Sequence, residues 1–195
     1  MNNYSIAQVL YLIYCKLRGF FVFKEARLVR FPIDLRGAKY IKVSKGFTTG
    51  VGCRLEAYPM NREQTMFFGE NVQMNDYVHI TAMKSVIIGS NVLLASKIYI
   101  SDCSHGSYNG DEFDSNPNII PNKRTLIAKP VVINDNVWLG EFVSVLPGVV
   151  IGKGTIVGAN SVVSKSLPPY VIAVGSPAKP IKEFNFETQK WVKIQ

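Results

Sequence analysis

The sequence predicts an all-β chain folded as a parallel β-helix, and three observations carry this prediction. From Ile133 to Val163 an aliphatic residue stands at every sixth position. A second row of small or β-branched residues, from Val137 to Ser161, stands four positions after each of the first five. Glycine directly follows three of the aliphatic positions, at Gly140, Gly152 and Gly158. Neither a helix of period 3.6 nor a strand of period 2 requires one special residue in six, whereas stacked coils of short strands and turns do.

Three hexads can close one triangular coil, so the aliphatic positions are expected to point into a prism and form its core. The strongest set is Ile133, Leu139, Val145, Ile151, Val157 and Val163. The glycines after these positions either relieve crowding at the corners or allow a positive φ. A weaker set starts near Val43 and runs through Thr49, Leu55, Phe68, Met74, Ile80, Ile88, Leu94 and Ile100, which places the β-helix at residues 40–167.

One long polar segment, residues 101–129, interrupts the hexads and is rich in Asn, Asp, Gly and Pro. A long irregular loop in a compact repeat domain is usually functional. The tail, residues 168–195, begins with Pro168 and Pro169, which cannot continue a strand ladder. Its aromatic residues Phe184, Phe186 and Trp191 are expected to cover the open end of the prism. All 195 residues are assigned to a single domain.

The first 30 residues predict a helical arm, in which Ile6, Val9, Leu10, Ile13 and Leu17 have helical spacing and Gly19 marks the expected end. Two interpretations stay open. The apolar side packs against the prism or a neighbouring subunit, or it lies in a lipid boundary with the basic residues near headgroups. These basic residues are Lys16, Arg18, Lys24, Arg27 and Arg30.

Composition sets further bounds on function. Of the net charge of +8, residues 1–45 carry +7, so the basicity belongs to the N-terminal arm and favours an anionic surface or charged substrate over nucleic acid. The cysteines Cys15, Cys53 and Cys103 form no CxxC pair and suit a reducing cytoplasmic setting, with Cys53 as an inward filler of the core. A signal peptide and an uncharged membrane-spanning stretch are not recognised.

Four features together resemble a known family: the hexads, ISDCSHG at residues 100–106, NVWLG at 136–140 and VGSPAK at 174–179. They are similar to the hexapeptide-repeat acyltransferases, and in particular to O-acetyltransferases of cell-surface polysaccharide synthesis, within the group of galactoside, maltose and xenobiotic acetyltransferases. The resemblance covers about residues 40–182. It implies a left-handed parallel β-helix, acetyl-CoA as cosubstrate, and a homotrimer with active sites between subunits.

The resemblance assigns the catalytic role to His105, which would deprotonate the acceptor hydroxyl for direct attack on acetyl-CoA. An alcohol needs such a base, and imidazole titrates near neutral pH. Many relatives carry a second histidine where this chain has Cys103. An acyl-cysteine with His105 as its base is therefore an alternative, because residues two apart on a strand share a face.

Most of the remaining site residues are also implied by the family motifs, while His79 is singled out by its place on a repeat corner. Trp138, Asn75 and His79 are expected on the acceptor side or the pocket wall, and His79 can equally be structural. The groove for pantetheine is expected along Glu141, Ala159, Ser164 and Lys165, with Lys179 and Lys182 on the phosphates. Relatives often carry arginine at the last two positions. No metal is expected, since His79 and His105 are the only histidines.

The predicted function is O-acetylation of a sugar or lipid-linked saccharide, such as an O-antigen, capsule or exopolysaccharide unit. Two alternatives remain open. N-acetylation of an amino-sugar nucleotide or small amine would need the same base and groove. A non-catalytic scaffold would not bind coenzyme A. The location is expected to be cytoplasmic, with peripheral contact of the N-terminal arm at the inner face of the membrane as a further expectation.

Overall fold

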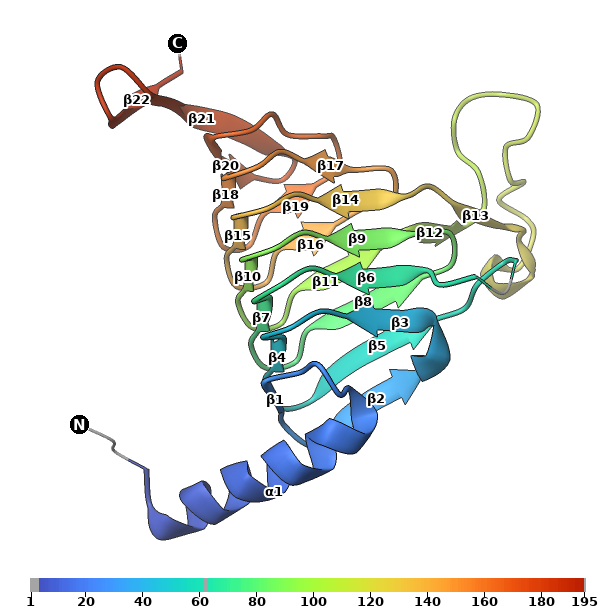
Figure 1. Cartoon of the computed structure of the whole chain (residues 1–195). Coiled ribbons are helices and arrows are strands. Elements are labelled where there is room, and N and C mark those ends of the chain that lie inside the picture. The colour runs from blue at the N-terminus through green and yellow to red at the C-terminus, as the bar shows by residue number, and fades with distance from the viewer. Residues whose placement is uncertain (1–3, 62, 195) are drawn as a thin grey trace.

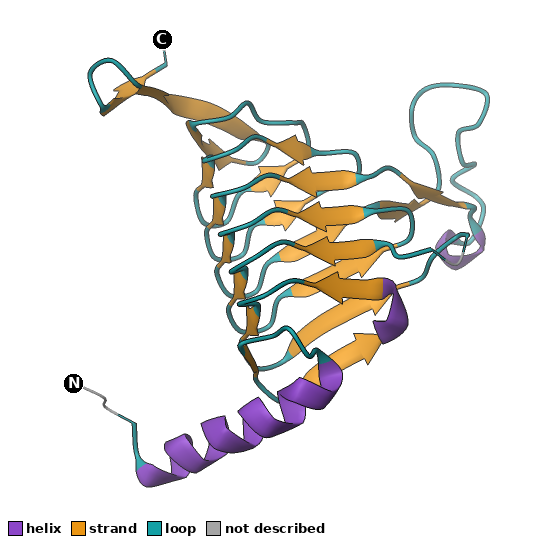
Figure 2. Cartoon of the chain, in the orientation of Figure 1, coloured by secondary structure: helices purple, strands orange, loops and turns teal. Residues whose placement is uncertain are grey.

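The computed structural model describes residues 4–61 and 63–194 and shows a triangular prism of stacked coils (Figure 1). One long helix lies beneath one end, a β-hairpin leaves the other end, and an arm projects from one corner (Figure 2). Three sheets form the sides of the prism, and their strands pair in parallel from coil to coil.

The sheets are distinguished by their number of strands. The nine-stranded sheet holds β1 (Leu28–Val29), β4 (Thr48–Thr49), β7 (Gln73–Met74), β10 (Leu93–Leu94), β15 (Trp138–Leu139), β18 (Ile156–Val157), β20 (Val171–Gly175), β21 (Ala178–Asn185) and β22 (Lys190–Lys193). The six-stranded sheet holds β2 (Ile33–Arg36), β5 (Cys53–Ala57), β8 (His79–Ala82), β11 (Tyr99–Ser101), β16 (Ser144–Val145) and β19 (Val162–Val163). The five-stranded sheet holds β3 (Ile41–Val43), β6 (Met66–Phe68), β9 (Val86–Ile88), β14 (Val131–Ile133) and β17 (Val150–Ile151).

The chain visits the sheets in a fixed order, which defines two corners that matter for the site. It passes from the nine-stranded to the six-stranded sheet at the first corner, for example at residues 140–143 and 158–161. It passes from the six-stranded to the five-stranded sheet at the second corner, for example at 146–149 and 164–166. One hexad therefore spans one side of the triangle.

The hexads predicted from the sequence form the core of the prism. Every aliphatic position from Ile133 to Val163 is fully buried, and so is the second row. The polar members of that row are satisfied inside, because Thr155 donates to the Pro168 carbonyl at 2.7 Å and Ser161 accepts from the Gly175 amide at 3.0 Å. Cys53 is buried as expected, and burial raises the pKa of its thiol to about 11.

The corners show why glycine follows the aliphatic positions. A Cβ on Gly140 would lie 2.6 Å from the backbone nitrogen of Ala159 in the next coil, so close stacking excludes a side chain. The left-handed backbone conformation falls instead on other residues of the corners, such as Asn136 and Asn160, both with φ of 59°. Crowding is thus the reason for glycine at position 140, while asparagine supplies positive φ.

The β-helix is longer than the predicted range of 40–167. Its first coil begins with β1, where Leu28 and Val29 pair in parallel with Thr48 and Thr49 of β4. At the other end the coil resumes after Pro169, because Ile172 and Ala173 of β20 pair with β18. The prism therefore includes part of both segments that were predicted as arm and tail.

The C-terminal aromatics do not cover the end of the prism as predicted. Strand β21 pairs antiparallel with β20 and then with β22, and this hairpin projects from the nine-stranded sheet (Figure 1). Phe184 packs edge to face against Phe186 and Trp191, and Phe186 against Tyr170. These ring contacts stabilise the hairpin. The last coil is covered, on the side of the nine-stranded sheet, by the backbone pairing of β21 with β20.

Helix α1 (Ile6–Val22) begins at a capping box, in which the Ser5 side chain accepts from the Gln8 amide and Gln8 accepts from the Ser5 amide. It continues past the predicted end at Gly19. That glycine is buried within the helix, and a Cβ there would lie 3.1 Å from the Cβ of Val29. Gly19 therefore permits close contact with the first coil and does not end the helix.

The segment predicted as an irregular loop is a partly ordered arm. Strand β12 (Cys103–His105) pairs antiparallel with β13 (Leu126–Ala128), and a short helix η2 (Pro121–Lys123) lies between them in the chain. The arm leaves the prism at the second corner, on the side opposite the nine-stranded sheet (Figure 1). A short helix η1 (Ala38–Tyr40) turns the equivalent corner of the first coil.

Candidate active site

The base of the arm is fixed by Asp102, a fully buried residue that sequence reasoning missed. Its carboxylate accepts hydrogen bonds from three consecutive backbone amides, those of Met83, Lys84 and Ser85, at 2.8, 2.7 and 2.7 Å. Its carbonyl accepts from the Lys129 amide at 2.7 Å, where the arm returns to the prism. The available signal was an aspartate two residues after Ile100, at the point where the hexads stop.

His105 stands at the outer end of β12, and its side chain is exposed. The Tyr108 hydroxyl donates to the His105 carbonyl at 2.5 Å and accepts from Arg124 at 2.7 Å. Arg124 also donates to the Ile119 and Pro117 carbonyls. The backbone of His105 is thus held by the arm, while its imidazole stays open to a reactant.

Cys103 lies on the same face of β12 but in a different environment. Burial, together with the nearby carboxylates of Asp102 and Glu56, raises the pKa of the Cys103 thiol above its usual value, against an opposing hydrogen bond from Ser101. Because the thiolate is the nucleophilic form, a raised pKa disfavours an acyl-cysteine. The surroundings of the two side chains therefore favour His105 as a base over Cys103 as a nucleophile.

A pocket of about 240 Å³ lies between the arm and the second corner. Ser104 and Ser107 line it from the arm, and Leu146 and Ser164 line it from the prism. Lys165 follows Ser164 and is exposed. Of the residues predicted along the cofactor groove, Ser164 and Lys165 thus lie at the corner from which the His105 arm projects.

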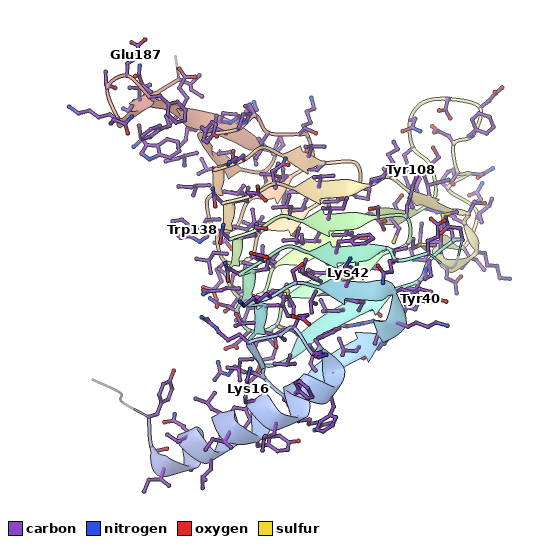
Figure 3. All side chains as sticks on the ribbon, in the orientation of Figure 1. Lys16, Tyr40, Lys42, Tyr108, Trp138 and Glu187 are labelled. Carbon is purple, nitrogen blue, oxygen red and sulfur yellow. The ribbon has the colours of Figure 1, made fainter. Side chains whose placement is uncertain are left out.

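Trp138 and the two predicted phosphate-binding lysines lie on another side of the prism. Trp138 projects from the nine-stranded sheet with 47% of its surface exposed, and Figure 3 shows it on the side of the prism opposite Tyr108. Trp138 pairs with Ile156, Ile156 with Ile172, and Ile172 with Lys182, so these four residues form one row across neighbouring strands. Lys179 is exposed at the start of β21.

Glu141 and Ala159 are both exposed at the first corner, in successive coils. Within a single chain, Glu141 and Ala159 therefore lie at a different corner from Ser164 and Lys165. The physical reason is the hexad itself, because five or six residues carry the chain from one corner to the next. These residues can share a groove only where two chains meet.

Asn75 is exposed at the end of β7, in an early coil. It lines a polar pocket of about 300 Å³ together with Arg27, Arg30, Thr49 and Asp76. This pocket belongs to the nine-stranded sheet and its first corner, so Asn75 lies on the same side of the prism as Trp138 and apart from His105.

His79 lies in a network of charged side chains on the outer face of the six-stranded sheet. Its Nε2 is 2.7 Å from a carboxylate oxygen of Glu56, whose side chain is only 6% exposed. Arg54 and Arg36 donate to the other oxygen at 2.6 and 2.8 Å. Tyr58 donates to it at 3.0 Å. His79 is thus one of the partners of the buried Glu56 carboxylate, and the Glu56 network is a second feature that the sequence did not reveal.

The Glu56 network predicts an acid-sensitive step in stability. Burial alone would raise the pKa of Glu56, but hydrogen bonds from His79, Arg54 and Tyr58 outweigh it and lower the pKa to about 2. At a pH between that value and the ordinary glutamate pKa of about 4.3, the unfolded chain binds more protons than the folded chain. The free energy of unfolding therefore falls as the pH falls through this range. At pH 6 the free energy of unfolding of the wild-type protein should exceed that of Glu56→Gln by roughly 1–3 kcal/mol.

Urea unfolding of both proteins at pH 6, 4.5, 3 and 2 measures this step. The difference in the free energy of unfolding between wild type and Glu56→Gln should become smaller as the pH is lowered from 4.5 to 2. A difference that stays constant over this range would show that the Glu56 charge does not contribute.

Within residues 4–61 and 63–194, no group of three or more His, Cys, Asp or Glu side chains is placed to hold a metal ion. Over the same ranges, no helix is long and apolar enough to cross a bilayer.

Sequence comparisons identify relatives of this chain. Residues 130–165 match the family model "Bacterial transferase hexapeptide (six repeats)". The chain is 48% identical over 171 residues to the Escherichia coli K12 protein named "Putative lipopolysaccharide biosynthesis O-acetyl transferase WbbJ", covering 88% of this chain and 86% of the relative. It is 35% identical over 117 residues to the galactoside O-acetyltransferase of the same organism, covering 60% of this chain and 53% of that relative.

Solved structures share the fold. A mutant of AntD, an N-acyltransferase from Bacillus cereus in complex with dTDP-4-amino-4,6-dideoxyglucose and coenzyme A, superposes with a TM-score of 0.68 at 20% identity, covering 89% of this chain and 90% of that one. A maltose O-acetyltransferase from Clostridium difficile 630 superposes with a TM-score of 0.53 at 25% identity, covering 93% of this chain and 90% of that one. The prism, the hexads and the long match to an acetyltransferase confirm the predicted fold class. The chain belongs to the hexapeptide-repeat acyltransferases, whose fold is the left-handed parallel β-helix, and it is an acetyltransferase of that family.

Proposed function

We propose that this enzyme transfers the acetyl group of acetyl-CoA to a sugar hydroxyl during synthesis of a cell-surface polysaccharide. The acceptor is a unit of an O-antigen, capsule or exopolysaccharide, or its lipid-linked precursor. The observation that carries the proposal is the exposed imidazole of His105 on an arm that is anchored to the prism through Asp102. The relative that matches 88% of the chain, named for lipopolysaccharide O-acetylation, supports the choice of acceptor.

His105 acts as the general base in this reaction. It accepts the hydroxyl proton while the acceptor oxygen forms a bond to the thioester carbonyl carbon. The carbon–sulfur bond then breaks, and the proton passes from the imidazolium to the departing thiolate of coenzyme A. The transfer is direct, in keeping with the raised pKa of the Cys103 thiol.

The active site is proposed to form between two chains of a homotrimer. One chain supplies the second corner with His105, Ser164 and Lys165, and its neighbour supplies the nine-stranded sheet and first corner. The supporting observation is that Tyr108 of the arm and Trp138 of the nine-stranded sheet lie on opposite sides of one prism (Figure 3).

On the neighbouring chain, the row from Trp138 to Lys182 offers an apolar wall that ends in a cation. Strands in a sheet are about 4.8 Å apart, so three steps along this row cover roughly 14 Å. An extended pantetheine arm needs such a length. Glu141 and Ala159 border the row at the first corner, while Lys179 and Lys182 are proposed to bind the phosphates of coenzyme A.

The acceptor side of the site is proposed to include Asn75 and Trp138, while His79 supports the prism from within the Glu56 network. The cysteines Cys15, Cys53 and Cys103 are all free, which supports a reducing, cytoplasmic setting.

A screen of acceptors tests the proposal. Purified enzyme with acetyl-CoA is offered matched pairs of sugars that differ in one position, hydroxyl or amine, and release of the coenzyme A thiol is followed. We expect acceptor-dependent release with hydroxyl sugars. Release with the amino sugars alone would establish N-acetylation in its place.

A further inference from the structure

Helix α1 exposes a continuous apolar face that its own prism does not cover. Eight large hydrophobic side chains of this helix are between 44% and 88% exposed: Ile6, Val9, Leu10, Ile13, Tyr14, Leu17, Phe20 and Phe21. At 100° per residue, all eight fall within an arc of about 140°. Scattered surface hydrophobics are ordinary, but a contiguous face of this kind marks an interaction site.

The opposite side of the helix is the one that contacts the prism. Cys15 and Gly19 are buried there, and the Tyr11 hydroxyl donates to the Phe31 carbonyl at 2.6 Å. The Lys16 amino group donates to the Arg27 carbonyl at 2.7 Å. The helix lies beneath the first coil, so the apolar face points away from the prism at its end, and the N-terminal half of the helix extends past the edge (Figure 1).

Charge around this face is mainly positive, although the exposed Glu25 stands between Lys24 and Arg27. The helix contains Lys16 and Arg18 and no acidic residue, and these two cations flank the two edges of the apolar arc. Exposed Lys24 and Arg27 follow the helix. Arg18 is held by its guanidinium over the Phe31 ring, 4.3 Å from the ring centroid. An apolar face bordered by cations fits the boundary between acyl chains and anionic headgroups.

A neighbouring prism is a poorer fit for this face. Prisms that pack side by side contact each other through their sheets, whereas this face points along the prism axis and beyond its end. A second copy that covered this face end to end would bring the basic first coils of both copies, within the +7 of residues 1–45, against each other. Like charges at that contact disfavour such a dimer.

We propose that α1 docks the enzyme on an anionic phospholipid surface, lying in the interface plane with its apolar face in the bilayer. The helix has 17 residues and is about 25 Å long, a length that suits a helix lying in the interface. The inference does not depend on the acceptor proposed above. It does place the prism upright on the membrane, with the coils stacked away from the lipid.

Vesicle sedimentation tests the docking surface. Full-length enzyme is mixed with vesicles of phosphatidylcholine alone or of phosphatidylcholine with 30% phosphatidylglycerol, at low and high salt. The wild type should sediment with the anionic vesicles at least tenfold more strongly than with the neutral ones, and high salt should weaken this binding. Equal sedimentation with both vesicle types, or none with either, would overturn the proposal.

A matched pair of double variants locates the contact. Leu10→Ser with Leu17→Ser removes two side chains from the middle of the apolar face, and should lower binding to anionic vesicles at least tenfold. Ile119→Ser with Ile120→Ser removes two exposed aliphatic side chains from the arm, and should leave binding within twofold of wild type. Equal loss in both double variants would contradict docking through α1.

Light scattering distinguishes the lipid from a second copy. If α1 served an end-to-end contact, the Leu10 and Leu17 double variant would halve the mass of the wild-type particle. We expect the same mass for both proteins. If the double variant had half the mass of the wild type, and the wild type did not bind vesicles, the partner of α1 would be a second copy of the chain and not the membrane.

Discussion

Replacing His105 with alanine is expected to lower kcat/KM for acetyl transfer by about 10²–10⁴-fold, the usual contribution of a general base. The loss should fall on kcat, because the imidazole is proposed to act on the hydroxyl proton in the transition state and not on acetyl-CoA binding. The exposed ring lies at the end of a strand whose backbone is held by Tyr108, so the substitution should leave the arm folded. Steady-state rates of thiol release, with both substrates varied, measure kcat and KM separately.

Two control variants distinguish His105 from the other candidates. His79→Ala removes the ring that binds Glu56, and Cys103→Ala removes the alternative nucleophile. The Cys103 variant should keep acetyl transfer within a few-fold of wild type, and the His79 variant should mainly lose stability. If Cys103→Ala abolished transfer while His105→Ala retained it, the direct mechanism would be wrong.

The same histidine variant tests the shared active site. His105→Ala chains coexpressed with Trp138→Ala chains would form mixed trimers. In these, some interfaces join an intact arm to an intact nine-stranded sheet. Activity above that of either variant alone is expected, whereas a site within one chain would give no recovery.

Replacing Asp102 with alanine is expected to destabilise the protein by about 3–5 kcal/mol. The carboxylate is fully buried and accepts three backbone amides, so its loss leaves three part-buried donors without their partner. Unsatisfied buried donors cost about 1–3 kcal/mol each, partly relieved by water that enters the space. Because the Asp102 carboxylate ties the start of the arm to residues 83–85 of the prism, transfer activity should fall together with stability.

Urea unfolding measures this change, and the arm offers a matched control. Asp114 also accepts two backbone amides, those of Asn109 and Gly110, but it is exposed. Its alanine variant should lose at most about 1 kcal/mol, since water can replace the carboxylate there. Similar losses for the two variants would show that burial of Asp102 does not control the stability of the corner.

The sequence predicted the prism well because its signal repeats. Each buried aliphatic residue from Ile133 to Val163 obeys the same six-residue spacing. The first coil follows the rule in part: Val29 and Leu35 are six residues apart and pair with the hexad positions Thr49 and Leu55, but the next such position, Val43, comes eight residues after Leu35 because η1 lies between them. It was missed because the basic residues around these positions were interpreted as an arm.

Features that depend on contacts distant in the sequence could not be predicted in this way. The antiparallel pairing of β12 and β13 joins segments separated by the mostly polar residues 106–125, with no periodicity to indicate it. Asp102 and Glu56 are single acidic residues whose importance comes from burial and from partners in other coils. The family motifs indicated His105 and Trp138 correctly as surface residues, but only the triangle shows that they face opposite ways.

The central claim is that this enzyme makes an ester on a sugar hydroxyl. It is tested most directly by carbon-13 NMR of the product formed from acetyl-CoA labelled at the acetyl carbonyl. The account predicts a labelled ester on the acceptor that is released by mild alkali or hydroxylamine, and that is absent when His105→Ala replaces the wild type. A labelled amide that survives alkali, or an ester formed equally well by the His105 variant, would contradict it.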